Sequence, residues 1–480
     1  MGVFDVNKEL LLSSIRGDPE NFVRLLEEEI GRVDELFQAA ALAAGGEKKL
    51  SSLSKFARRN RDVVWKVARE FDAWNQGSEG VEAVEASKAQ FLSPVERADV
   101  RLGYAPMAFL GGTASCLLVL FVVILITHAN AYDYFLWMPA HRVFRMFILL
   151  SLYIFSLAVD AKIFSAFLWS PSSDILLPFR DLAAIAFQIC SITLALTCAY
   201  LIHGRGDLDR ERAADYWLVA LVGVQLLYLV NPFPLLYRDA RVSLLRALGR
   251  IALSPFSKPD FFTIWLADQF CSLIVILSDF GYTLCYFIVD AGRSKDTCTA
   301  QVDPWLRSAV ACIPFWFRLM QCARRFWDDG YGYGHLANAG KYGLSLCVAS
   351  FATLHALTDG FNGKWDAFRI LWLIFGVLAT VASAIWDVTM DFSGVSRRNR
   401  YFPKWCLGIA VASNSLLRCA WLFTVAPLPF AGFMYERILE FSLGFAEILR
   451  RAQWNVYRIA NEHVQTIERT QKSLLNNHLN

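Results

Sequence analysis

Hydrophobic and polar positions divide this chain into a polar amino-terminal part and a much longer apolar part. Up to about residue 100 the chain is polar, and apolar residues recur at helical spacing in FVRLLEEEIGRVDELF and in LSKFARRNRDVVWKVAREFDAW. Beyond that point, apolar runs follow one another at short intervals. The first run, Pro106–His128, exceeds the roughly 20 apolar residues that cross the hydrocarbon of a bilayer. The pattern predicts a small soluble helical domain followed by a polytopic membrane protein.

About ten membrane-spanning helices are predicted in the apolar part. Their approximate residues are 106–128, 142–160, 182–203, 214–232, 262–290, 305–323, 343–358, 366–390, 405–425 and 432–458. The stretch 233–258 carries four arginines among leucines, which is too charged to span and is typical of a helix lying along the membrane interface. With a cytosolic amino terminus, this number of crossings returns the carboxyl terminus to the cytosol and places basic loops there, as the positive-inside tendency favours.

The composition supports a membrane protein and narrows its partners. Hydrophobic residues make up 55% of the chain and charged residues only 19%, which excludes an ordinary soluble protein and predicts contact with membrane lipids. The net charge of +3 and the scattered basic residues exclude a nucleic-acid partner. The 11 cysteines include no C-x-x-C pair, so we expect small buried apolar side chains and neither a metal site nor a disulfide framework. The amino terminus lacks the pattern of a cleaved signal peptide.

Ionisable residues within the later spans are the most informative feature, because a charge at the bilayer centre costs roughly 2.5–3.5 kcal/mol on insertion scales. They are Asp268, Asp279, Arg307, Arg318, Lys341, Asp387, Asp391, Arg418, Glu447, Arg450 and Arg451. The spacing of Asp387 and Asp391 places both on one helix face, and the same spacing predicts an ion pair between Glu447 and Arg451. Trp421 follows Arg418 closely enough for its ring to pack beside the guanidinium.

Two interpretations of these charges remain open. In the first, the arginines and Lys341 face a shared aqueous path and bind a tetrahedral oxyanion, while the acids keep the empty path near neutrality. In the second, Asp–Arg pairs hold helices together, or side chains near the ends of spans reach the interface. A structural pairing role is favoured for Asp279, Asp391 and Arg318.

The sequence resembles the EXS domain of the SPX-EXS phosphate exporters between about residues 227 and 463. The resemblance is carried, in order, by YLVNPFPLLYR, IWLADQFCSLIVILSDFGY, CIPFWFRLMQCARRF, HLANAGKYG, IWDVTMDF, LLRCAWLF and EILRRAQWNVYRIANEH. The family includes the xenotropic and polytropic retrovirus receptor, plant phosphate exporters and Golgi proteins. The resemblance implies an all-α membrane protein in which four peripheral helices precede a core of six helices, with phosphate passing through the core.

The resemblance also implies a division of the chain into four parts. Residues 1–100 would form a cytosolic, shortened SPX-like domain, 101–232 four peripheral transmembrane helices, 233–463 the EXS domain with its interfacial helix, and 464–480 a cytosolic tail. In the family, a basic SPX helix helps to bind inositol pyrophosphates. Lys66 and Arg69 fall on matching positions, whereas Glu70 and Ala73 replace expected lysines and the first helical hairpin is missing. Regulation by inositol pyrophosphate is therefore a hypothesis, and no other cofactor is implied.

Residues that match the family's phosphate path would line or gate the same path here. They are Asp268, Arg307, Lys341, Tyr342, Asp387, Arg418, Trp421, Glu447, Arg450 and Arg451. The aromatic ring of Trp421 is interpreted as a movable plug. After LADQ the family pattern offers an Asn and a Ser, whereas this chain has Cys271 and Ile274, which removes polar contacts to phosphate.

Three functions compete for this sequence. The leading one is export of inorganic phosphate by a channel or uniporter-like carrier, since no G-x-x-x-x-G-K-[ST] motif for ATP-driven transport occurs. The second is a Golgi sorting protein, with or without recycling of phosphate from the lumen. The third is a membrane acyltransferase using His335 or His463, but neither histidine has a recognisable nucleophile or metal-ligand spacing, so an enzyme is not expected. The choice between plasma membrane and Golgi, and between monomer and homodimer, stays open.

Overall fold

The computed structural model describes residues 94–127, 140–167, 177–203, 208–233, 237–290, 297–359, 365–393, 403–425 and 433–479 of the 480-residue chain. All elements in these ranges are helices and none is a β-strand, so the predicted all-α class is confirmed. The predicted SPX-like region, including Lys66 and Arg69, lies outside the described residues. Residues 107–461 form one unit, and the site lies within it.

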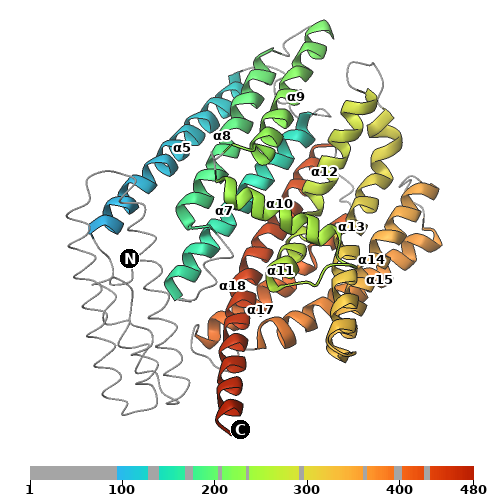
Figure 1. The fold of residues 1–480 in the computed structure, drawn as a ribbon. Helices are drawn as coiled ribbons and strands as arrows, with labels where there is room; N and C mark the ends of the chain where they lie inside the picture. The colour runs from blue at the N-terminus through green and yellow to red at the C-terminus, as the bar shows by residue number, and fades with distance from the viewer. Residues whose placement is uncertain are drawn as a thin grey trace. The chain divides into compact units, whose positions relative to one another are not determined.

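Helices follow one another along the described part of the chain (Figure 1). They are α5 (Pro94–Thr127), α7 (Ala140–Phe167), α8 (Phe179–His203), α9 (Leu208–Val230), α10 (Arg238–Ala252), α11 (Phe261–Phe270), α12 (Ile274–Cys285), α13 (Asp303–Asp328), α14 (Tyr333–Asp359), α15 (Ala367–Trp386), α17 (Lys404–Arg418) and α18 (Phe433–Leu479). Short π-helical turns form at Tyr286–Asp290, Cys298–Val302 and Asp387–Asp391, and a 3-10 turn forms at Ala420–Thr424.

Among the described residues, 5 helices are long and apolar enough to cross a membrane. They are Pro106–Thr127, His141–Ile163, Phe179–His203, Ala367–Asp391 and Trp405–Thr424, and the bent pair Phe261–Phe270 and Ile274–Asp290 adds a further candidate. The long helices α13, α14 and α18 are less apolar because they carry charged side chains, several of which are buried. The polytopic membrane class is therefore confirmed.

The predicted span 262–290 is bent by 69° between α11 and α12, instead of forming one straight helix. A capping box starts α11: the amide of Thr263 donates to Asp260 Oδ1 at 2.8 Å, and the amide of Asp260 donates to Thr263 Oγ1 at 3.1 Å. At the break, the amide of Ser272 bonds to the carbonyl three residues earlier, which is the tighter 3-10 pattern. The Ser272 hydroxyl accepts a hydrogen bond from Arg451 Nε of α18 at 2.6 Å, so the break supplies a polar group to the centre of the bundle.

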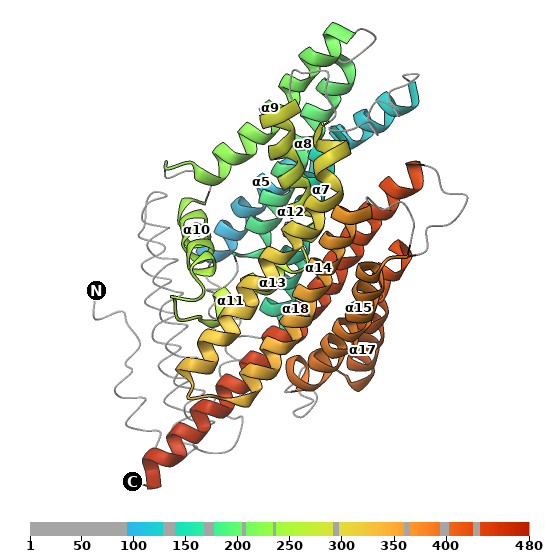
Figure 2. The same cartoon turned by 90° about the vertical axis from the view of Figure 1, so that its right-hand side faces the viewer.

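Successive helices lie side by side. α7 packs along α8, α13 along α14, and α14 along α15. Figure 2 shows α13 and α14 running together over most of their length, with α15 and α17 beside each other. These pairings place charged positions of α14, α15, α17 and α18 around one interior region.

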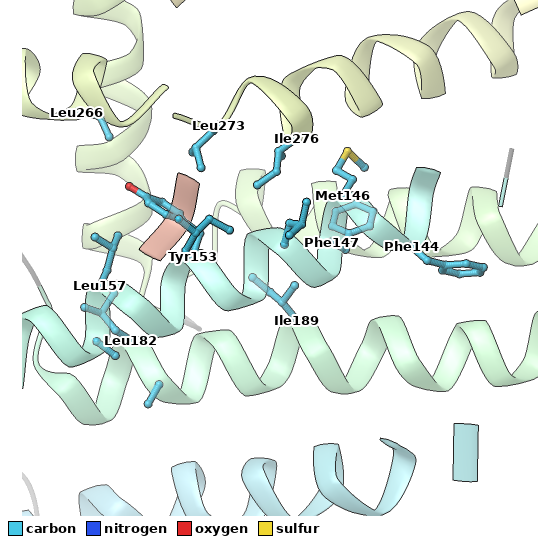
Figure 3. Close-up of a cluster of buried hydrophobic side chains, with 14 of the residues drawn as sticks. Phe144, Met146, Phe147, Tyr153, Leu157, Leu182, Ile189, Leu266, Leu273 and Ile276 are labelled. Atoms are coloured by element: carbon cyan, nitrogen blue, oxygen red, sulfur yellow. The ribbon is translucent and has the colours of Figure 1, made fainter. Parts of the chain in front are cut away.

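An apolar core joins α7 to α8 and to the α11–α12 pair (Figure 3). Phe144 and Leu149 of α7 are almost completely buried in it. At the same core, Gly444 lets α18 approach α7 closely, because a Cβ atom at this position would lie 2.9 Å from Leu149 Cδ1. Small residues at such contacts are the usual device by which membrane helices gain packing energy, since lipid supplies no hydrophobic drive for association.

The amphipathic helix predicted within 233–258 is present as α10. Its Arg241 is buried and donates to the carbonyl oxygens of Tyr228 at 3.0 Å and Asn231 at 2.6 Å. These carbonyls belong to the end of α9 and the residue that follows it, so Arg241 satisfies groups that the end of a helix leaves without partners.

A disulfide joins Cys285 and Cys298, so the expectation that the cysteines form no disulfide is wrong at this pair. α12 ends at Cys285, and the π-helical turn Cys298–Val302 begins at its partner, with the two Cα atoms 6.0 Å apart. The sequence separation of 13 residues gave no sign that the two turns meet. The other cysteines are free thiols, and Cys116 and Cys419 are exposed in place of the buried positions that were expected.

Candidate functional site

A cavity of about 380 Å³ lies between α11, α12, α14, α15, α17 and α18. Its charged and polar lining includes Asp268, Ser272, Lys341, Tyr342, Thr380, Asp387, Asp391, Arg418, Glu447, Arg450 and Arg451. Trp421 also lines it. All the predicted path residues except Arg307 therefore reach one cavity, although they come from helices that are far apart in the chain.

Asp387 and Arg418 connect α17 to the π-helical turn at the end of α15. Arg418 donates to Asp387 Oδ2 from Nε at 2.9 Å and from Nη2 at 2.6 Å. The amide of Asn414, one turn earlier on α17, donates to the same oxygen at 2.7 Å. Both residues line the cavity, and the Arg418 side chain, 17% exposed against 1% for Asp387, is the more accessible partner.

Glu447 and Arg450 form a bidentate pair on α18. Arg450 donates to the Glu447 carboxylate from Nε at 2.9 Å and from Nη2 at 2.5 Å. The predicted ion pair between Glu447 and Arg451 is therefore corrected: three-residue spacing, not four-residue spacing, selects the partner. Arg451 instead donates to Ser272 at 2.6 Å, and its guanidinium lies 4.5 Å from the centre of the Trp454 ring.

Lys341 is held by aromatic faces. Its Nζ lies 4.4 Å from the centre of the Tyr342 ring and 5.1 Å from that of Trp386. Among the described residues, no carboxylate oxygen lies within ion-pair distance of Lys341 or of Arg451. Cation–π contacts hold a cation in place while leaving N–H donors for another acceptor.

Asp268 has two donors next to the cavity. Arg318 Nε donates to its Oδ1 at 2.6 Å, and the hydroxyl of Tyr342 donates to the same oxygen at 2.5 Å. Arg318 also donates to Gln321 at 2.6 Å and stacks over the Tyr342 ring at 4.7 Å. Arg318 is not among the cavity-lining residues, so the pair ties α13 to α11 behind the cavity wall.

Asp391 lies at the end of the π-helical turn that Asp387 begins. It accepts a hydrogen bond from Trp454 Nε1 at 3.0 Å and lies 3.6 Å from Arg458 Nε. The π-helical turn makes the amide of Phe392 bond to the carbonyl of Asp387 at 2.9 Å, one residue further back than in an α-helix. Both carboxylates reach the cavity, each with its own partners on other helices.

Trp421 packs against α15. Its Nε1 donates to Thr380 Oγ1 at 3.0 Å, and its ring meets Trp372 edge-on, with centroids 6.0 Å apart. A Cβ atom placed on Gly376 would lie 3.0 Å from the far edge of the indole. The sequence predicted that the ring would pack beside Arg418, whereas its recorded partners lie on α15.

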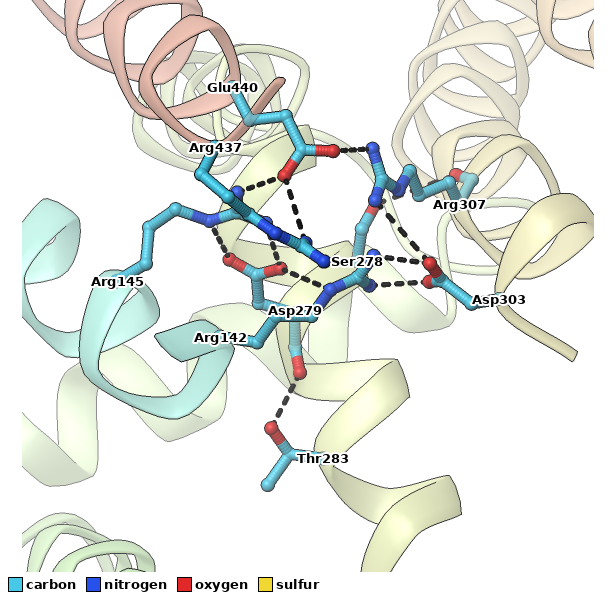
Figure 4. Close-up of polar contacts among 9 residues, drawn as sticks. All are labelled: Arg142, Arg145, Ser278, Asp279, Thr283, Asp303, Arg307, Arg437 and Glu440. Atoms are coloured by element: carbon cyan, nitrogen blue, oxygen red, sulfur yellow. Dashed lines mark hydrogen bonds and ion pairs between the residues drawn. The ribbon is translucent and has the colours of Figure 1, made fainter. Parts of the chain in front are cut away.

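Arg307 belongs to a separate network of charges shown in Figure 4. The members that carry charge are Arg142, Arg145, Asp279, Asp303, Arg307, Arg437 and Glu440. Glu440 of α18 accepts hydrogen bonds from both Arg145 and Arg307, and Arg145 also contacts Asp279 at 2.6 and 2.8 Å. This network joins α7, α12, α13 and α18. The pairing role predicted for Asp279 agrees with these contacts.

Sequence reasoning missed two groups of residues. Uncharged polar side chains at the cavity (Ser272, Thr380) and beside it (Asn414) were not predicted, because the prediction rested on ionisable residues. Arg142 and Arg145 were not predicted because they lie at the start of an early span, where an arginine is usually interfacial. The triplet SNS around Asn414, inside an otherwise apolar span, was the available signal.

Of the two histidines considered for an enzyme, the structure describes the side chain of His335. His335 Nε2 lies 2.8 Å from Asp329, next to the turn between α13 and α14, and the described side chains contain no cluster that could hold a metal ion. The side chain of His463 lies outside the described residues. Cys271 and Ile274, the departures from the family pattern, both line the cavity.

Comparison with known proteins gives one family match. Residues 140–464 match the model described as the EXS family. The chain is 32% identical over 266 residues to the xenotropic and polytropic retrovirus receptor 1 homolog of Xenopus laevis, an alignment that covers 51% of this chain and 38% of the relative. It is 31% identical over 275 residues to solute carrier family 53 member 1 of Homo sapiens, covering 51% and 39% of the two chains.

A plant relative matches over a longer stretch. The phosphate transporter PHO1-2 of Oryza sativa subsp. japonica is 30% identical over 308 residues, which is 62% of this chain and 37% of the relative. The alignments thus span less than two fifths of the length of these relatives. None of the three names describes an enzyme.

Proposed function

Because this chain belongs to the EXS family, we propose that it carries inorganic phosphate across a membrane through the cavity between α11, α12, α14, α15, α17 and α18. The name of the rice relative describes phosphate transport. The family match over residues 140–464 includes the helices that form the cavity. The exporting direction, from the cytosol outward, follows from the resemblance to phosphate exporters.

The observation that carries this proposal is the set of cations at the cavity. Lys341, Arg418, Arg450 and Arg451 all line it. Among the described residues, Lys341 and Arg451 have no carboxylate partner, although each is fixed by neighbouring rings or a hydroxyl. A cavity that places such donors around empty space favours a tetrahedral oxyanion, because charge-assisted hydrogen bonds are about twice as strong as neutral ones.

The carboxylates set how tightly the anion is held. Asp387 and Glu447 neutralise Arg418 and Arg450 before phosphate arrives, so an entering anion competes with pairs that are already formed. Conduction requires an anion that is attracted enough to enter and weakly enough held to leave. We propose that Lys341 and Arg451 attract the phosphate anion. The two ion pairs lower the affinity of the cavity for it.

Two further residues belong to the proposed path. Trp421 lies at the cavity beside α15 and is proposed as the gate. Arg307 lies on α13 about 16 Å from Arg318 by helical rise, away from the cavity in the direction of the ion network. We propose that Arg307 and its partner Glu440 form a constriction that phosphate passes after leaving the cavity.

The disulfide supports the proposed orientation. A structural disulfide is typical of the extracellular space or the lumen of the secretory pathway, because the cytosol keeps thiols reduced. We therefore propose that Cys285 and Cys298 lie outside the cytosol. Counting crossings from a cytosolic amino terminus places the same segment on that side.

The experiment is efflux of radioactive phosphate from liposomes that contain the purified full chain. The native chain is compared with Arg418→Ala, with empty liposomes as the background. Efflux that depends on Arg418 supports a phosphate path through the cavity. Efflux equal to that of empty liposomes, for native chain that is folded and inserted, removes the proposal and favours a sorting role.

A further inference from the structure

The indole of Trp421 rests in a defined position on α15. Its far edge contacts the surface of α15 at Gly376, where even a single methyl group would come within 3.0 Å of the ring. One turn further along the same helix, Thr380 Oγ1 accepts the indole hydrogen bond at 3.0 Å. Trp372, one turn before Gly376, meets the ring edge-on. These three residues lie at four-residue intervals and so form one stripe of α15.

This stripe lies to one side of the charged part of the cavity. Thr380 precedes Asp387 by two helical turns, and Gly376 precedes it by three, which is about 10–16 Å of helical rise. Trp421 itself lies in the 3-10 turn Ala420–Thr424 that follows α17, three residues after Arg418. The contacts of the indole on α15 therefore lie between Asp387 and the end of α15 that contains Ala367.

The contact with Gly376 closes the space between the ring and α15. Because the ring lies in van der Waals contact with a residue that has no side chain, no gap remains between the ring and α15 at Gly376. A larger residue would hold the ring away from the helix. Glycine is also a poor helix former, costing about 1 kcal/mol relative to alanine, so its position inside α15 needs a packing reason.

We propose that Gly376 and Thr380 form a seat that holds Trp421 in the closed position of the phosphate path. Gly376 supplies the space into which the ring fits, and Thr380 supplies the hydrogen bond that fixes the rotation of the indole. Both are positioning residues that act through Trp421. The effect of the seat on transport rests on the proposed function. Its effect on the position of the Trp421 ring does not, because that position can be measured separately.

The test measures ring position and phosphate efflux on the same variants. The full chain is labelled with 5-fluorotryptophan in detergent, and the fluorine signal of Trp421 is assigned by its loss in Trp421→Phe. The variants are Gly376→Ala, Gly376→Val, Thr380→Val and Thr380→Ser. Gly408→Ala is the matched control, because Gly408 is on α17 and has open space around its Cβ position.

We expect both Gly376→Ala and Thr380→Val to shift the Trp421 signal and to raise phosphate efflux. For Thr380→Val the increase should be about fivefold, since the net loss of one hydrogen bond changes an equilibrium by roughly this factor. Gly376→Val should have the larger effect, whereas Gly408→Ala should behave as the native chain. Thr380→Ser keeps the hydroxyl and should leave the Trp421 signal at its native position.

If the fluorine signal of Trp421 stays unchanged in both Gly376→Val and Thr380→Val, the proposed seat is wrong. A moved signal with unchanged efflux, in protein that transports phosphate, would overturn its closing role. If the native chain moves no phosphate, the proposed function fails and the closing role fails with it, while the fluorine signal still decides whether the seat positions the ring.

Discussion

Asp387 accepts two hydrogen bonds from Arg418 on a single carboxylate oxygen, from Nε at 2.9 Å and from Nη2 at 2.6 Å. The acid begins the π-helical turn at the end of α15, and the arginine ends α17. The pair therefore fixes two helix ends relative to each other while the guanidinium still borders the cavity. The pair thus contributes to helix packing and also borders the proposed phosphate path. Separating these two roles requires more than one substitution.

Removal of Arg418 should affect both stability and transport. Arg418→Ala leaves the buried Asp387 carboxylate without its cation, which typically costs about 3 kcal/mol of stability. The double variant Arg418→Ala/Asp387→Asn removes the stranded charge. We expect thermal unfolding in detergent to recover in the double variant while phosphate efflux stays at background. Recovery of efflux together with stability would show that Arg418 acts only in holding the helices together.

Substitution of Lys341 should lower phosphate binding with little effect on the fold. Among the described residues Lys341 has no carboxylate partner, so Lys341→Met strands no buried acid. The loss of one charge-assisted hydrogen bond predicts about tenfold weaker phosphate binding. Isothermal titration of the purified chain with phosphate measures this change. Unaltered affinity in a well-folded variant would remove Lys341 from the site.

A substitution at Arg307 should separate the rate of transport from binding. Arg307→Gln lies outside the cavity, in the network that includes Glu440, so we expect slower phosphate efflux with unchanged phosphate affinity. Efflux from liposomes and equilibrium titration are measured on the same preparation. A matching loss of affinity would indicate that Arg307 contacts phosphate in the cavity, in a conformation different from this one.

The contact between α7 and α18 should tolerate no side chain at Gly444. Gly444→Ala places a methyl group 2.9 Å from Leu149 Cδ1, and overpacking of this kind costs about 1–3 kcal/mol. Gly223→Ala in α9, where the added atom meets nothing within 4 Å, is the control. The midpoint of thermal unfolding in detergent should fall for the first variant and stay level or rise for the second.

The disulfide gives a direct test of orientation. In denatured protein, a maleimide mass tag should leave Cys285 and Cys298 unmodified until a reductant is added. In intact cells or sealed vesicles of known orientation, a membrane-impermeant reductant and tag should reach this pair only from the non-cytosolic side. Cys285→Ser should also lower stability by about 3 kcal/mol, as expected for a loop of this length. Labelling from the cytosolic side would reverse the proposed orientation.

The sequence by itself determined the class of the protein and most of the residues at the cavity. Apolar runs long enough to cross a bilayer predict membrane helices because the cost of burying a charge or a free peptide group in lipid is large. The same cost makes ionisable residues such as Asp387 and Arg418 conspicuous in the sequence. Resemblance to the EXS domain then selected the members that the structure brings to one cavity, with Arg307 as the exception.

Only the tertiary structure decided which of these residues are partners. Helical spacing permitted Glu447 to pair with Arg450 or with Arg451, and the choice follows from Ser272, which the break between α11 and α12 places beside Arg451. The position of Trp421 likewise depends on Gly376. The absence of a side chain there matters only because the turn that follows α17 packs against α15.

Long-range contacts of this kind could not be predicted from local pattern. The disulfide, the network around Glu440 and the buried position of Arg145 all depend on segments distant in the chain that meet at a specific helix register. The pattern of apolar residues fixes which segments enter the membrane, whereas packing between their side chains fixes the register. The chemistry of the site depends on the helix register, because the register decides which side chains are partners.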